Sequence, residues 1–143
     1  MITNYNIIII DKDQKNLKIL ENNFIQAGFN VDKASTDVEA LNLLKKRPFH
    51  IIISELSGPG IDGYRLLEKI QGDPSISNIP VVFLTVKSDT WNRIKSFKLG
   101  AKDYIVKPKH VKEIVSRVQM ILNRLDRRNK EETLDRKKLA GRI

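Results

Sequence analysis

Polar side chains that can bind ions follow four separate apolar runs of this 143-residue sequence. Asp11 comes directly after the run 7–10, Glu55 comes two positions after the run 51–53, Thr85 ends the run 79–85 and Lys107 follows the short run 104–106. Such runs are typical of buried strands, and the carboxyl ends of parallel strands lie at one edge of a sheet. Two carboxylates, a hydroxyl and an ammonium group would then form one polar site.

The composition excludes several other kinds of chemistry. The chain has no cysteine, which rules out disulfides, thiolate metal sites and cysteine nucleophiles. Its two histidines, His50 and His110, are sixty positions apart, so they lack the close spacing of a zinc site and neither is assigned a catalytic role. A Gly-x-Gly-x-x-Gly or Walker-type loop is also missing, so no motif supports nucleotide binding.

The elements that must position the polar residues alternate regularly along the chain. Strands are predicted at 5–10, 29–34, 49–53, 79–85 and 101–106. Helices are predicted between them from apolar residues at helical spacing, and the clearest amphipathic pattern covers 111–125. Gly58, Pro59 and Gly60 indicate a loop after the third strand. This order predicts an α/β fold with a parallel sheet and helices on both of its faces.

Four motifs in this pattern resemble the receiver domain of bacterial two-component response regulators. They are IIIID (7–11), PGIDG (59–63), IPVVFLT (79–85) and GAKDYIVKP (100–108). The resemblance covers about residues 5–125 and implies a flavodoxin-like fold, with a doubly wound five-stranded parallel sheet in the order 2-1-3-4-5 and five helices. It also implies a phosphoryl-transfer site, in which an aspartate accepts the group from a phosphohistidine donor with the help of Mg²⁺ and a lysine.

Several site positions of the family can be carried over by their motifs. Asp11 matches the first member of the family's acidic pair, Thr85 the hydroxyl residue and Tyr104 the aromatic switch residue. The second acidic position falls on Lys12, and the phosphoacceptor position falls on Glu55. The resemblance therefore predicts an atypical variant, a pseudo-receiver with glutamate where the family has aspartate.

The last motif supplies the lysine and the proline of the family's site. Lys107 matches the lysine of the family's site, and the Pro108 that follows it is the candidate for a cis peptide bond. Lys12 and Lys107 would balance the charges of Asp11 and Glu55 without a metal ion, so we expect no metal or other cofactor. If a metal does bind, Asp11 and Glu55 are its expected ligands.

Two interpretations of Glu55 remain open. Glutamate is one methylene longer than aspartate, so its carboxylate could approach the place of the phosphoryl oxygens and mimic the phosphorylated state. Alternatively, the site is merely degenerate. In both cases we expect no enzymatic activity and a phosphorylation-independent signalling module for protein interaction or dimerisation. The alternative is a working phosphoacceptor that uses Mg²⁺ and receives its phosphoryl group from a sensor histidine kinase.

The expected interaction surface consists of the fourth helix, the strand 101–106 and the helix 111–125. Trp91 lies near the start of the fourth helix and has two interpretations, a half-covered edge of the core or an anchor for a binding partner. Either a protein partner or a second copy of the chain could bind there.

The C-terminal segment carries much of the net charge of +9. From Asn123 onward there are eight Lys and Arg against four Asp and Glu, with no aromatic residue to stack on bases. We therefore expect a receiver domain at 1–125 and a charged helical linker at 126–143 towards an output domain absent from this chain; nucleic-acid contact is a lesser alternative. The apolar runs are too short for a membrane span, and we expect a cytoplasmic protein without membrane partners.

Overall fold

A five-stranded parallel sheet forms the centre of the computed structural model, which describes residues 4–141. The strand order is β2-β1-β3-β6-β7, which is the predicted order once the five sheet strands are counted along the chain. The flavodoxin-like fold is thus confirmed. The strands are β1 (Asn6–Ile10), β2 (Asn30–Ala34), β3 (Ile51–Ser54), β6 (Val81–Thr85) and β7 (Asp103–Val106).

Isoleucine runs explain why β1 and β3 occupy the middle of the sheet. All four isoleucines of the run Ile7–Ile10 and all three of Ile51–Ile53 are buried, alternately on one face and on the other. The two strands pair in register, Ile7 opposite Ile51 and Ile10 opposite Ser54. β-Branched side chains buried on both faces favour a central parallel strand over a helix. Their common register brings the ends of β1 and β3 to the same edge.

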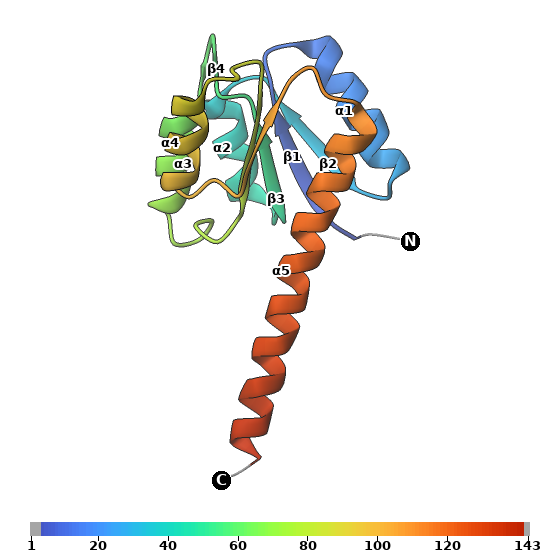
Figure 1. Ribbon diagram of the computed structural model, residues 1–143, viewed down its shortest axis with the longest axis vertical. Coiled ribbons are helices and arrows are strands. Elements are labelled where there is room, and N and C mark those ends of the chain that lie inside the picture. The colour runs from blue at the N-terminus through green and yellow to red at the C-terminus, as the bar shows by residue number, and fades with distance from the viewer. Residues whose placement is uncertain (1–3, 142–143) are drawn as a thin grey trace.

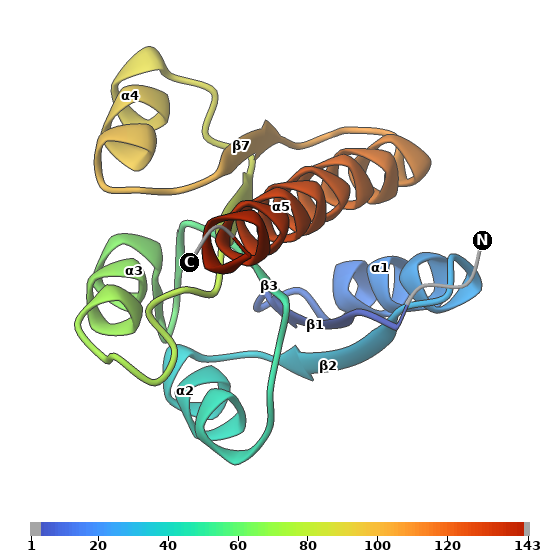
Figure 2. The ribbon, with the colours of Figure 1, turned by 90° about the horizontal axis from the view of Figure 1, so that it is seen from below.

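Five helices within residues 4–141 surround the sheet, and four of them pack on its two faces (Figures 1 and 2). Residues of α1 and α5 complete the apolar cluster on one face, and residues of α2 and α3 complete the cluster on the other. Within residues 4–141, neither cluster includes a side chain of α4, which lies beside β7 at the margin of the molecule (Figure 2). The helices are α1 (Gln14–Gln26), α2 (Asp37–Lys46), α3 (Gly63–Gln71), α4 (Thr90–Lys98) and α5 (Val111–Ala140).

The loop predicted around Gly58 to Gly60 contains a short hairpin that the sequence analysis did not predict. Strands β4 (Ser57–Gly58) and β5 (Ile61–Asp62) pair antiparallel. Gly58 and Gly60 both have positive φ angles, which lets the chain reverse within two residues. The Asp37 carboxylate accepts a hydrogen bond of 2.8 Å from the Asp62 amide, and this bond holds the hairpin against the start of α2.

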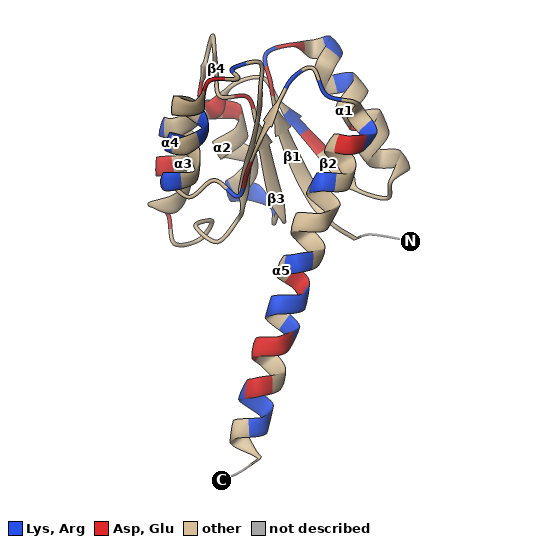
Figure 3. Cartoon of the chain, in the orientation of Figure 1, with Lys and Arg blue, Asp and Glu red and all other residues tan. Residues whose placement is uncertain are grey.

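The C-terminal helix α5 is 30 residues long and projects well beyond the sheet (Figure 1). Its first turns pack on the sheet through Ile114, Val115, Val118 and Leu122. From residue 126 to residue 140 every side chain is exposed, and acidic and basic residues alternate along this part (Figure 3). Residues 142–143 of the expected linker, and residues 1–3 of the expected receiver region, lie outside the described part of the chain.

Candidate functional site

Three charged side chains meet at the carboxyl edge of the sheet. The Lys107 ammonium lies 3.0 Å from a carboxylate oxygen of Asp11 and 2.9 Å from one of Glu55. The side chains of Asp11, Glu55 and Lys107 are only 8%, 10% and 18% exposed. A single ammonium group therefore bridges two nearly buried carboxylates that come from the ends of β1 and β3.

Asp11 accepts three hydrogen bonds from the protein. Its Oδ1 accepts from the Asp13 amide at 3.0 Å, and its Oδ2 accepts from Asn16 Nδ2 at 2.9 Å and from Lys107. Burial alone would raise the pKa of Asp11, but these bonds outweigh burial and hold the pKa below its usual value. The carboxylate is thus held in its charged form.

Lys107 is held in its charged form by the same contacts. Burial alone would lower the pKa of Lys107, but the hydrogen bonds and charges of Glu55 and Asp11 outweigh it and raise the pKa above its usual value. The second oxygen of Glu55 accepts a hydrogen bond of 2.7 Å from the Leu56 amide. All three charged groups therefore have partners within the protein, as buried charges require.

The expectation that Lys12 would help to neutralise this site is wrong. Lys12 is exposed and forms no ion pair within residues 4–141, whereas Lys107 alone contacts both carboxylates. Lys12 lies two residues beyond the end of β1. The next residue, Asp13, caps α1 by accepting hydrogen bonds from the amides of Lys15 and Asn16. Sequence reasoning also missed Asn16, although its position in the first turn of α1 makes it a natural neighbour of Asp11.

Thr85 and Tyr104 are joined through the backbone of one residue, Lys87. The hydroxyl oxygen of Thr85 accepts a hydrogen bond of 3.3 Å from the Lys87 amide, and the Tyr104 hydroxyl donates one of 2.8 Å to the Lys87 carbonyl. Both side chains are buried, and burial is the main reason that the pKa of Tyr104 is raised to about 12. Tyr104 is therefore turned inward and fixes the loop between β6 and α4.

Lys107 is positioned by the strand that precedes it. Its amide donates a hydrogen bond of 2.7 Å to the Thr85 carbonyl at the end of β6, and the Lys107–Pro108 peptide bond is cis. The charged cluster and Thr85 thus lie at the carboxyl ends of neighbouring strands, as the sequence analysis expected of parallel strands. Tyr104 lies further back in β7, opposite Phe83.

A family model described as the response regulator receiver domain matches residues 7–119. The chain belongs to this family. A putative response regulator from Chloroflexus aurantiacus is 33% identical, with a TM-score of 0.78 over 85% of this chain and 99% of that chain. The non-phosphorylated receiver domain of HemR from Leptospira biflexa is 29% identical, with a TM-score of 0.76 over 82% of this chain and 94% of that chain.

Curated relatives of this receiver domain are longer than the chain. A probable transcriptional regulator, ycf29 of Porphyra purpurea, is 39% identical over 120 residues, which are 84% of this chain and 57% of that protein. The chain therefore spans only about half the length of the curated relatives that it matches.

None of the helices within residues 4–141 has the length and apolar character that crossing a membrane requires.

The carboxylates at the carboxyl edge of the sheet do not fit the Mg²⁺ ion that the family implies. Mg²⁺ is usually held by one or two carboxylates together with waters, but one oxygen of Asp11 and one of Glu55 are each paired with the Lys107 ammonium. The Lys107 ammonium also lies directly between the two carboxylates. Residues 4–141 contain no cluster of three or more histidine, cysteine or acidic residues that could hold a metal ion.

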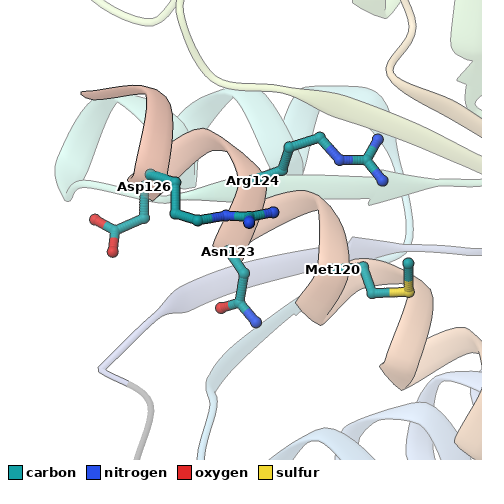
Figure 4. Close-up of a pocket in the computed structure, with 5 residues that line it drawn as sticks. Met120, Asn123, Arg124 and Asp126 are labelled. Carbon is teal, nitrogen blue, oxygen red and sulfur yellow. The ribbon is translucent and has the colours of Figure 1, made fainter. Parts of the chain in front are cut away.

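Trp91 lies in the first turn of α4 and is 69% exposed, so the interpretation as a half-covered core edge is wrong. Its exposed ring lies near the ammonium of Lys95, which is 6.0 Å from the ring centre. A second surface feature is a groove along α5 beside Met120, Asn123, Arg124 and Asp126 (Figure 4). All the residues that line this groove come from one helix, so it encloses no site comparable to the buried charged cluster.

Proposed function

We propose that this receiver domain is a protein-interaction module of a signalling system that works without phosphorylation. In this proposal Glu55 stands at the phosphoacceptor position and Lys12 at the second acidic position. The observation that carries the proposal is the Lys107 ammonium, held between Glu55 and Asp11 at 2.9 and 3.0 Å. A phosphoryl group would have to displace this contact, and a metal ion would meet the Lys107 charge at the same place.

We further propose that Glu55 acts as a built-in substitute for the phosphorylated state. Its longer side chain takes the negative charge to Lys107, the residue that would otherwise neutralise phosphoryl oxygens. Tyr104 is turned inward at the same time, with its hydroxyl on the Lys87 carbonyl. This combination supports an arrangement already set for partner binding over a merely degenerate site.

The partner surface in this proposal comprises α4, β7 and the first turns of α5, with Trp91 as an anchor. Tryptophan is enriched among residues that dominate binding energy, and this one is exposed on α4. A sensor histidine kinase belongs to the alternative function, in which Mg²⁺ binds and the chain accepts a phosphoryl group. The hydrogen bonds that Asp11 accepts from Asp13, Asn16 and Lys107 argue against that alternative, because a metal ion would have to compete with them.

Mass spectrometry after incubation with Mg²⁺ and a small phosphodonor tests this proposal. The natural chain is expected to show no adduct, whereas a phosphoryl group would add about 80 Da. The double variant Lys12→Asp with Glu55→Asp restores both acidic positions, and it is the control that should gain the adduct. A stoichiometric adduct on the natural chain would overturn the proposal, whether or not the double variant also carries one.

We propose that residues 126–143 connect the receiver domain to an output region. The similarity to longer proteins named transcriptional regulators supports this role. Nucleic-acid contact by the segment itself has weaker support, since acidic residues interrupt its basic ones and Lys130 is paired with Asp126 at 3.1 Å. Alternating charges at this spacing stabilise an isolated exposed helix instead.

A further inference from the structure

A hollow of about 430 Å³ lies beside the charged cluster, between α1 and the start of α5. These two helices lie side by side (Figures 1 and 2), and two loop segments complete the lining, Val86 after β6 and residues 107–109 after β7. Lys107 takes part in both features, because its side chain lines the hollow and its ammonium bridges Asp11 and Glu55. We call this feature the α1–α5 hollow.

The size and place of the α1–α5 hollow fit a ligand of low molecular mass. Small-molecule sites in proteins typically have volumes of about 300–1,000 Å³. In parallel α/β sheets ligands bind just beyond the carboxyl ends of the strands, and residues 86 and 107–109 follow the ends of β6 and β7. Four separate segments of the chain meet in this hollow, whereas the groove of Figure 4 is lined by α5 alone.

Most of the lining is apolar. Leu20 and Ile114 are 2% and 4% exposed and belong to the core cluster on this face, so packing fixes their positions. Ile19 and Val86, by contrast, are 44% and 68% exposed. Exposed apolar side chains around a hollow are typical of binding sites, because a ligand removes them from water. The apolar residues of the lining are Ile19, Leu20, Val86, Pro108, Val111 and Ile114.

The polar residues of the lining already have partners within the chain. Lys107 is held by the charged cluster, and Lys109 forms an ion pair of 3.4 Å with Glu113 in the first turn of α5. Asp13 caps α1 through two backbone amides, and Asn16 donates a hydrogen bond to a carboxylate of the charged cluster. An ionic ligand would have to break one of these contacts, whereas an uncharged ligand would only displace water from apolar side chains.

Other occupants fit the α1–α5 hollow less well. A second copy of the chain or another protein would need about 800 Å² of surface on each partner, to which two exposed apolar side chains contribute little. An anion finds unlike surroundings in a hollow of about 420 Å³ at the amino end of the sheet, which is lined by Lys45, Lys46 and Arg47. We call it the amino-edge hollow. The two hollows have similar volumes and differ in the charge of their lining.

We propose that the α1–α5 hollow binds a small uncharged molecule with an apolar body, such as an aromatic ring or a short hydrocarbon chain, against Ile19, Val86 and Ile114. The inference goes beyond the proposed function, because it requires neither a protein partner nor a particular phosphorylation state. The bound molecule would cover the Lys107 side chain and exclude water from the neighbouring ion pairs. Charges attract more strongly in less polar surroundings, so the ligand would reinforce the charged cluster.

Two dyes that share one skeleton test the chemistry of the site in the full chain. N-phenyl-1-naphthylamine is uncharged, and 8-anilinonaphthalene-1-sulfonate carries the same rings with a sulfonate. Both become brighter in apolar surroundings. We expect saturable binding of one uncharged dye molecule per chain, and at least about tenfold weaker binding of the sulfonate at the same site, because burying its charge there has no compensating partner.

Matched variants test the place of the site. Ile19→Glu puts a charge into the lining and should weaken binding of the uncharged dye by at least about tenfold. Ile25→Glu is its control, because Ile25 is 52% exposed on the same helix and lies outside the lining. Val86→Ser should weaken binding by about threefold, whereas Val38→Ser, at a position that is 70% exposed on α2, should leave it unchanged. Circular dichroism should show all four variants folded.

Methyl NMR spectra of the natural chain locate the dye without any substitution. We expect the largest shifts at Ile19, Val86 and Ile114, and none at Ile76 and Ile79, which line the amino-edge hollow. These spectra also keep the inference testable if a variant fails to fold.

Several outcomes would overturn the inference. They are binding that does not saturate, an equal loss with Ile19→Glu and Ile25→Glu, a sulfonate dye that competes with equal affinity, shifts centred on the amino-edge hollow, or a dimer whose formation displaces the dye. The titrations contain neither Mg²⁺ nor a phosphodonor. Their failure therefore overturns the ligand inference alone, whereas a phosphoryl adduct in the mass measurement overturns the proposed function.

Discussion

The charged cluster and helix α4 are built in opposite ways. In the cluster, polar groups are buried and each has a partner, with Lys107 joined to Asp11 and Glu55. On α4, the buried hydroxyl of Ser96 has no partner within the described residues, and the apolar side chains face outward. The polar groups of the first region are paired within the chain, whereas the apolar side chains of the second are exposed.

This difference indicates how the two regions divide the work of the domain. Contacts made within the folded chain add to its stability and are not available for a ligand, as in the cluster. Contacts left unmade add little to stability and are available for a partner, as on α4. Tyr104 contacts α4 and the loop before it, because the guanidinium of Arg93 lies 5.7 Å from the centre of its ring and its hydroxyl donates to the Lys87 carbonyl.

Removing the shared ammonium is the most severe test of the cluster. Lys107→Met leaves the Asp11 and Glu55 carboxylates close together and without their cation. Breaking a buried ion pair from one side typically costs about 3–5 kcal/mol, so we expect a loss of this size in the free energy of unfolding. Chemical denaturation of the variant and the natural chain measures it.

Lys18→Met is the control for that substitution, because Lys18 is exposed on α1 and should change the stability by less than about 0.5 kcal/mol. If Lys107→Met lowers the free energy of unfolding no more than the control does, the comparison is contradicted, because the charged cluster would then not stabilise the fold.

The fold could be predicted from the sequence because its signals are local and repeated. Isoleucine runs and the regular alternation of strands and helices determine which segments pair, and Asp13 and Thr36 cap α1 and α2. The β4–β5 hairpin was missed, because each strand has only two residues, too few to show a pattern.

The site was predictable only in part. The residues that gather at the carboxyl edge follow from strand order, and they lie where parallel pairing requires. The direction of a side chain two residues beyond the end of a strand does not follow from strand order, so the role of Lys12 was wrongly assigned. Trp91 left two interpretations for a similar reason, since helical spacing alone does not reveal that α4 buries Ser96 instead.

The pH dependence of stability sharpens the comparison at intermediate size. The pKa of Asp11 is lowered in the folded chain, from an ordinary value of 3.8. A lowered carboxyl pKa stabilises the fold above the unfolded value, and this contribution disappears as pH falls through the folded value. The loss from one such group is at most about 1.4 kcal/mol per pH unit.

Asp11→Asn removes this titration. We therefore expect its stability deficit against the natural chain to be largest near neutral pH and to shrink as pH falls below 3.8, in denaturant melts at several pH values. A deficit that stays constant with pH would mean that the Asp11 charge is not what the cluster stabilises.

The smallest expected effect is on α4, and it tests the other side of the comparison. Phe97 is half-exposed and belongs to neither apolar cluster, so Phe97→Ala should change the free energy of unfolding by less than about 0.5 kcal/mol. Leu67→Ala on α3 is the matched truncation of a buried side chain and should cost about 2–5 kcal/mol. If the two truncations cost the same, Phe97 serves the fold and is not free for a partner. If they differ as expected, Phe97 contributes little to the stability of the folded chain, and its exposed apolar surface remains available for contact with a partner.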